Sequence, residues 1–339
     1  MKTPELIVFG CLTPDNVVTA DGECLPQTFG GNALYGALGA RVWSDRVGMV
    51  SRYGTGYPAA CFELLRSLGV NIDGVRHLGK AHGRNVAFAY RADGSRTRSF
   101  PASVINRIPV AERHRFIDTS LLPDAAERWL EFSPDETDVP AEWWPSVRGI
   151  HCATLPVAKH VRIAAGARAR FERSAWIQID SPWFDTGEKP ADHTPSLFPA
   201  LNAFLPSEAD VAAFWPGTDL NRRHIALLDG GAEFVVLKLG AAGCRIFKRG
   251  QGLIAEIPVV DVRAEDPTGA GDAFCGGFLA GLLETGDVVE AARFGTVSAS
   301  FAVQAHGLRG LVERSGEEAT NRLASLRIAA IPVSSKGGP

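Results

Sequence analysis

The chain has 339 residues, a hydrophobic fraction of 45%, a charged fraction of 22% and a formal net charge of −3. These values are typical of a globular protein and give no reason to expect a nucleic-acid or acidic-membrane partner. The six cysteines are scattered without C-x-x-C pairs, which argues against a zinc site. No apolar run is as long as a membrane span, and no signal-peptide pattern begins the chain, so we expect a cytoplasmic protein.

Strand and helix patterns alternate along most of the chain. Helices are predicted at 32–42, 58–68 and about 157–172, and short apolar runs predict strands at 6–11, 47–50, 149–153, 176–180, 203–205, 234–239 and 245–247. This alternation predicts an α/β fold of three layers, with helices on both faces of a mostly parallel central sheet.

Two segments break this alternation. Residues 13–29 surround a turn at 20–22, and residues 84–100 surround a turn at 92–94, so each predicts a β-hairpin. We expect the hairpins to form a small β lid over the main sheet. The prediction is therefore one domain over 1–333 with two inserted hairpins, a surface loop at 181–195 and a frayed tail at 334–339.

The strongest local signal is the sequence DPTGAGDAF at 266–274, which a helical pattern over 273–283 follows. Pro267 and the glycines bar a helix before residue 269, so the chain turns sharply into a helix whose first amides are unpaired. Gly269 and Gly271 let an anion approach this backbone closely. Asp272 would repel a merely bound phosphate, but it suits a base that takes a proton from an attacking hydroxyl. The alternative is that Asp272 has no catalytic role and stands there because Asp is favoured in the first turn of a helix.

The sequence at 266–274 resembles the C-terminal signature D-T-x-G-A-G-D-x-F of the ribokinase-like (PfkB) carbohydrate kinase family. In that family the Asp of the last G-D pair is the catalytic base, and the G-A-G amides form the anion hole for the transferred phosphoryl group. The resemblance implies that Asp272 is the base and that Gly269, Ala270 and Gly271 form the hole. It assigns Thr268 to nucleotide binding.

Other segments resemble the family in order and spacing from about residue 6 to residue 307. Gly10 and Asp15 have the spacing of a strand end and a sugar-binding Asp, and a Gly-Gly pair opens the helix at 32–42. The substrate-side residues that this implies are Asp15, Gly30, Gly31, Asn32 and Tyr35. Tyr35 stands where sugar kinases often have Asn, so it either stacks on a substrate ring or packs in the core. Asn32 offers an amide from the adjacent turn.

Two further segments resemble the family's nucleotide side. Residues 205–210 resemble an N-x-x-E pattern, with Ser207 and Asp210 in its two places and Glu208 as a substitute for the Glu. Residues 236–243 resemble T-x-G-x-x-G; Lys238 replaces the Thr, and Gly240 and Gly243 keep the glycines. Lys238 either touches a nucleotide phosphate or is an exposed lysine at a strand end. The resemblance implies ATP and Mg²⁺, with Glu208 and Asp210 near the metal, and leaves a monovalent cation such as K⁺ open.

The activity that the resemblance implies is transfer of the γ-phosphoryl group of ATP to a hydroxyl, preferably a primary one, of a sugar or similar small molecule. A nucleoside kinase is one alternative, and a non-catalytic ligand-binding homologue, permitted by the residues at 55, 207 and 238, is another. A homodimer through the lid edges and a self-capped monomer both stay open. The second hairpin contains four arginines, Arg84, Arg91, Arg96 and Arg98. They are either solvent-exposed charges on an edge strand or contacts to an acidic or phosphorylated substrate.

Overall fold

The computed structural model describes residues 1–91, 96–172, 174–184, 195–214, 225 and 227–328. The predicted tail at 334–339 and most of the predicted loop at 181–195 lie outside the described residues. The predicted helices at 32–42, 58–68 and 157–172 agree with the structure to within one residue at each end. Within the described residues, no helix combines the length and the apolar character needed to cross a membrane.

The main sheet has nine strands, and all neighbouring pairs are parallel except the two at one edge. From that edge to the other, the strands are β13 (Gly252–Ile257), β12 (Cys244–Lys248), β11 (Phe234–Lys238), β10 (Ala203–Phe204), β9 (Trp176–Ile179), β8 (Gly149–Cys152), β1 (Leu6–Phe9), β4 (Val47–Thr55) and β5 (Asn71–Ala81). Because most strands are parallel, their carboxyl ends meet at one edge, where ligands bind in such folds.

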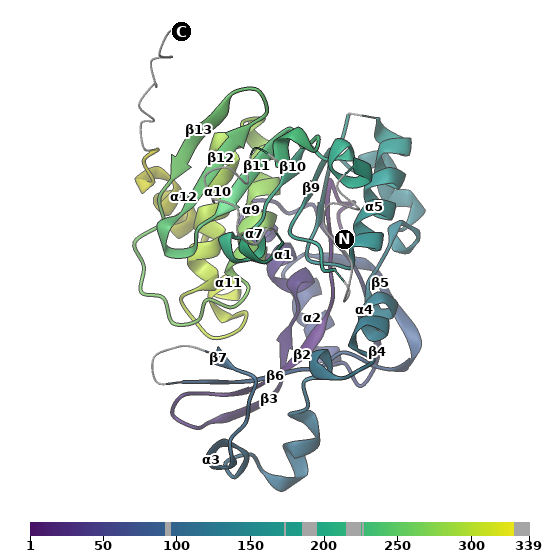
Figure 1. The fold of residues 1–339 in the computed structure, drawn as a ribbon, viewed down its shortest axis with the longest axis vertical. Helices are drawn as coiled ribbons and strands as arrows, with labels where there is room; N and C mark the ends of the chain where they lie inside the picture. The colour runs from purple at the N-terminus through teal and green to yellow at the C-terminus, as the bar shows by residue number, and fades with distance from the viewer. Residues whose placement is uncertain (92–95, 173, 185–194, 215–224, 226, 329–339) are drawn as a thin grey trace.

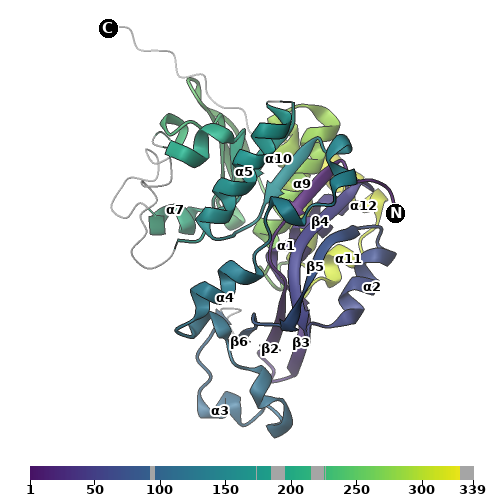
Figure 2. The ribbon, with the colours of Figure 1, turned by 90° about the vertical axis from the view of Figure 1, so that its right-hand side faces the viewer.

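Helices cover both faces of this sheet (Figures 1 and 2). Successive residues of β1 point to opposite faces: Leu6 and Val8 belong to one apolar cluster, and Ile7 and Phe9 to another. The first cluster joins β1 to α1 (Asn32–Arg41), α2 (Ala59–Ser67), α9 (Ala270–Thr285), α10 (Val288–Ala302), α11 (Arg309–Val312) and α12 (Gly316–Ser325). The second includes α5 (Val157–Phe171). The expected three-layer fold is confirmed.

A four-stranded second sheet stands apart from the main sheet, in the lower part of Figure 1. Its order is β3 (Cys24–Gly30), β2 (Thr13–Val18), β6 (Val86–Tyr90) and β7 (Arg96–Thr97). Two antiparallel hairpins, β2 with β3 and β6 with β7, join through the parallel pair of β2 and β6. This sheet is the expected β lid, and β2 reaches it four residues after the end of β1.

The sequence patterns did not predict the elements of the segment between the lid and β8. It contains α3 (Ala102–Ile105), α4 (Ala125–Phe132) and four short 3-10 helices at Val110–Arg115, Thr119–Leu121, Glu136–Asp138 and Ala141–Ser146. Three later short elements are Phe198–Ala200, α7 (Glu208–Phe214) and Gly240–Ala242. Strand β4 was also expected to end at Val50, because Ser51 and Arg52 are polar, but it runs to Thr55.

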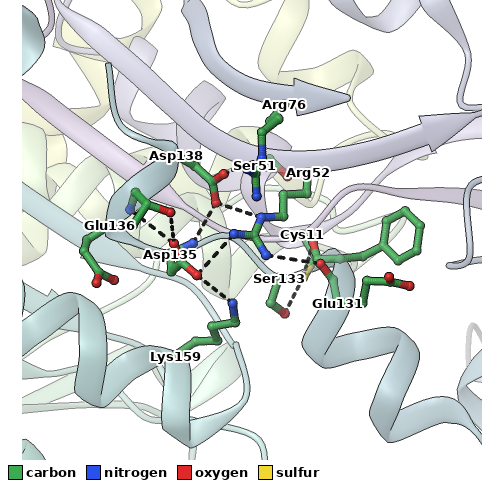
Figure 3. Close-up of polar contacts among 12 residues, drawn as sticks. Cys11, Ser51, Arg52, Arg76, Glu131, Ser133, Asp135, Glu136, Asp138 and Lys159 are labelled. Carbon is green, nitrogen blue, oxygen red and sulfur yellow. Dashed lines mark hydrogen bonds and ion pairs between the residues drawn. The ribbon is translucent and has the colours of Figure 1, made fainter. Parts of the chain in front are cut away.

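A buried ion-pair network explains how β4 continues through Arg52 (Figure 3). The Arg52 guanidinium donates to Asp138 at 2.8 Å and to Asp135 at 3.1 Å. Lys159 of α5 donates to Asp135 at 2.9 Å, and Arg76 of β5 pairs with Asp138 at 2.7 Å. The network therefore fastens the segment around 135–138 to both β4 and α5.

Replacing Arg52 by Met is expected to destabilise the protein by about 3–5 kcal/mol, because two buried carboxylates would lose a partner. Burial raises the pKa of Asp135, but hydrogen bonds from Thr137 and Lys159 outweigh it and hold that pKa well below its usual range. The stabilisation of the folded protein that follows from this lowered pKa is present at neutral pH and is lost as the pH falls below about 4. Urea unfolding at pH 7 and at about pH 3 measures both effects. Arg162→Met, which removes an exposed partner of Asp135, is the control and should cost far less.

Candidate active site

The sequence at 266–274 forms a tight turn into α9. Gly269 has the left-handed backbone angle φ +72° and precedes the helix, whose first acidic residue is Asp272. The Ala270 amide donates to the Pro267 carbonyl at 3.3 Å, while no acceptor is found for the Gly271 and Asp272 amides within the described part of the chain. Unpaired amides at a helix start favour an anion at that point.

Helix α1 fixes this turn by packing directly against it. A Cβ on Gly269 would lie 2.1 Å from the Tyr35 ring, and a Cβ on Gly276 would lie 1.9 Å from the Gly36 carbonyl oxygen. Tyr35 is buried in the core and also borders a cavity under the lid. Tyr35 therefore packs in the core, and its stacking on a substrate ring stays a prediction that its place at the cavity permits.

Asp272 lies in a cluster of charged side chains at the carboxyl ends of the parallel strands. Asp180 directly follows β9, and Lys238 ends β11; the Lys238 ammonium lies 2.6 Å from the Asp180 carboxylate. The same ammonium would be 3.3 Å from a Cβ on Gly271, so it stands beside the turn into α9. The exposed alternative for Lys238 is wrong, because its side chain is buried in this pair. Asp180 was not singled out from the sequence, although an Asp after an apolar strand was a usable signal.

The cluster sets the protonation of Asp272. The pKa of Asp272 is raised to about 8: burial is the largest cause, the charges of Asp180 and Asp210 add to it, and Lys238 opposes the rise. Lys238 itself stays charged: burial lowers its pKa, but Asp180 more than offsets this. A carboxyl group with a pKa near the working pH is suited to accept a proton during a reaction.

Ser207, Glu208 and Asp210 surround the start of α7. The Asp210 carboxylate accepts hydrogen bonds from the Ser207 hydroxyl at 2.5 Å and the Ser207 amide at 3.0 Å, while Glu208 is exposed. Asp210 therefore caps its own helix and keeps one oxygen for other contacts. Among the described residues, no three His, Cys, Asp or Glu side chains surround a common point. One or two carboxylate groups are enough for Mg²⁺, because this ion takes most of its other ligands from water and from substrate phosphates.

A glycine turn follows Lys238. Gly240 and Gly243 have positive φ angles of 56° and 85°, and a Cβ on Gly243 would lie 2.0 Å from the Ile257 carbonyl oxygen. The turn thus needs glycine to pass close to the end of β13. It lies at the same strand end as Lys238, next to the charged cluster.

A cavity of about 340 Å³ lies between the lid sheet and the turn at 266–269. Asp15 and Thr28 line it from the lid, and its apolar lining includes Phe88 and Tyr90. The hydroxyl groups of Tyr90 and Thr268 lie 3.2 Å apart. The structure thus places Thr268 at this cavity, and its assignment to nucleotide binding stays a prediction.

The Gly-Gly pair shapes one wall of the site. A Cβ on Gly30 would overlap the Asp15 carboxylate at 2.2 Å, and Gly31 has φ +110° with the Cys11 carbonyl oxygen 2.3 Å from its Cβ position. The Asn32 amide accepts from the Cys11 amide at 2.7 Å and donates to the Thr154 carbonyl at 2.8 Å. Asn32 therefore holds two loops together, and both ends of its amide are engaged.

Comparisons with known proteins find similarity to kinases, both in sequence and in fold. Residues 151–314 match the family model described as pfkB family carbohydrate kinase. A cytidine kinase of Thermococcus kodakarensis is 23% identical over 86% of this chain and 93% of its own length. An uncharacterized sugar kinase of Archaeoglobus fulgidus is 32% identical over 41% of this chain and 56% of its own. A putative ribokinase II of E. coli, solved with ATP and Mg²⁺, superposes with a TM-score of 0.68 at 17% identity, covering 95% and 99% of the two chains.

Proposed function

Because this chain belongs to the PfkB carbohydrate kinase family, we propose that it transfers the γ-phosphoryl group of ATP to a hydroxyl group of a sugar or sugar-like molecule, preferably a primary hydroxyl. The observation that carries this proposal is the partly buried Asp272 carboxyl group, with its raised pKa, beside the unpaired amides at the start of α9. A base and an anion site at one point are what phosphoryl transfer to an alcohol requires.

In the proposed mechanism, Asp272 accepts the proton of the attacking hydroxyl while the bond to phosphorus forms and the bond to ADP breaks. The Gly271 and Asp272 amides stabilise the charge on the transferred group, and Gly269 gives them access to it. The positive charge of Lys238 offsets part of the negative charge of Asp180 and Asp272. Mg²⁺, when bound near Asp210 and Glu208, supplies charge neutralisation for the ATP phosphates. A monovalent cation such as K⁺ is a further proposal that addition and removal of K⁺ in the assay tests.

On the acceptor side, we assign orientation of the substrate to Asp15 and to the backbone at 30–31. Thr268 belongs on this side as well, since its hydroxyl faces the cavity with Tyr90. The lid sheet covers the cavity and keeps water from the phosphoryl group, which limits ATP hydrolysis.

A nucleoside is the second candidate acceptor, and the cavity lining favours it. Four aromatic rings line the space, from Phe29, Tyr35, Phe88 and Tyr90. Such rings stack well on a base, whereas a simple sugar offers mostly hydroxyl groups. The match to a protein named cytidine kinase points in the same direction.

The test is ADP release by the purified protein with Mg-ATP and a panel of pentoses, hexoses, alditols and nucleosides. We expect one class to raise ADP release well above the background rate of ATP hydrolysis. If none does, calorimetry with ATP and each compound follows. Binding without turnover would support the non-catalytic alternative and contradict the proposed transfer.

A lid-mediated dimer is a separate proposal. Strands β3 and β7 end the lid sheet, so each presents one edge without a partner strand in that sheet. Unpaired edges invite pairing with a second copy. The molecular mass in solution, measured by light scattering, distinguishes a dimer from a monomer.

A further inference from the structure

Arg84 is a buried cation that the proposed mechanism does not use. It lies just before β6, and only 7% of the residue is exposed. Its guanidinium carbon lies 3.9 Å from the centre of the Trp129 ring. Among the residues that the structure describes, none forms a hydrogen bond or an ion pair with this guanidinium. The expectation that the arginines of the second hairpin are solvated therefore fails for Arg84, whereas Arg91 and Arg98 are exposed.

The surroundings of Arg84 connect it to the carboxyl edge of the main sheet and to the lid strand next to Asp15. Trp129 stacks on Trp183 with 5.3 Å between ring centroids and an interplanar angle of 10°. Trp183 lies three residues after Asp180, and backbone hydrogen bonds to Leu155 and Val157 fix it at the carboxyl edge of the sheet. On the lid side, Asp15 lines the cavity and pairs in register with Val86, two residues after Arg84.

Neighbouring carboxylates do not neutralise Arg84 by direct contact. Burial lowers the pKa of Arg84, while electrostatic interactions, among them those with Asp118 and Asp15, oppose this. Asp118 accepts hydrogen bonds from the Ser120 amide and hydroxyl at 2.9 and 2.6 Å and pairs with Arg98 at 3.5 Å. The Asp15 carboxylate accepts from the Thr13 hydroxyl at 2.8 Å.

A buried charge without a hydrogen-bonded partner is costly, so it is usually paired in the working state of a protein. The Arg84 residue keeps 7% of its surface exposed. With one face of the guanidinium on Trp129, its edge remains available for an oxyanion, and this edge binds carboxylate and phosphate oxygens in pairs.

We infer that Arg84 binds an anionic group of the acceptor substrate, either a carboxylate or a phosphate monoester. This inference rests on the proposed function and narrows it, because the acceptor becomes a hydroxyl-bearing acid or a sugar phosphate. Asp15 then orients hydroxyl groups and Arg84 holds the anion of the same molecule.

The test compares ligands of matched carbon length in the absence of ATP: four- to six-carbon aldonates, the corresponding alditols, and sugar phosphates. Calorimetry should show at least one anionic class binding about 10-fold or more tightly than its alditol. Arg84→Gln should weaken that binding about 10–100-fold, as expected for a charged hydrogen bond. Arg84→Lys should retain part of it, and Arg91→Gln, an exposed arginine of the same lid, should retain all of it. The aldonate and phosphate arms identify which anion is bound.

The outcomes separate this inference from the proposed function. If no anion binds more tightly than its alditol to the unaltered protein, the inference is wrong, even where Arg84→Gln does not fold. ADP release from a neutral acceptor with kcat/KM unchanged in Arg84→Gln also overturns it and leaves the kinase activity intact. Arg84-dependent binding of an anion without ADP release from any acceptor would support the inference and contradict the proposed transfer.

Discussion

Asp272→Asn is expected to lower kcat about 10³-fold or more while the fold remains intact, because the amide cannot accept the hydroxyl proton. Asn has nearly the same shape as Asp, and it removes a carboxyl group whose pKa the surroundings raise. ADP release with the best acceptor measures the loss, and urea unfolding measures stability. Asp73→Asn, at an exposed position on β5, is the control and should leave both unchanged. A variant that keeps more than a tenth of the activity would contradict the role of Asp272.

The pH dependence gives an independent reading of the same group. Asp272 must be deprotonated to accept a proton, and its pKa is raised to about 8, first by burial. The value of kcat/KM should therefore rise with pH through about pH 8 and fall by a factor of ten per pH unit well below it. A profile flat between pH 6 and 9 would show that Asp272 is not the titrating base.

Lys238→Met is expected to destabilise the protein by about 3–5 kcal/mol, since it leaves the buried Asp180 carboxylate without its partner. The same change removes a charge that lowers the pKa of Asp272, so that pKa should rise further. The pH at which kcat/KM declines should consequently move upward. Urea unfolding and the pH profile of ADP release measure the two effects together.

Asp180→Asn supplies the opposite control within the same pair. Removing the Asp180 charge takes away a cause that raises the pKa of Asp272, so the pH profile should move downward. The double variant Lys238→Met with Asp180→Asn should recover much of the lost stability, because no unpaired buried charge remains. Shifts of equal sign in the two single variants would contradict the electrostatic account.

The sequence allowed prediction of the fold and of the turn into α9, because their signals are local. The alternation of strand and helix patterns along the chain predicts the layers. Pro267 and the glycines at 269 and 271 predict the turn into a helix. Asp180 and Lys238 come from strands that lie next to β10 on its two sides, so their pairing depends on strand order, which no local pattern contains. Arg84 likewise needed the placement of Trp129, a residue of α4 that no pattern predicted.

The near-contact of α1 and α9 has a consequence for how such a protein diversifies. Gly36 and Gly276 bring the two backbones so close that a methyl group does not fit between them, so both helices form one rigid unit with the turn at 269. The lid, in contrast, is connected along the chain by the segments that follow β1, β3, β5 and β7. Changes in the lid segments would therefore alter the lining of the cavity without moving the turn at 269.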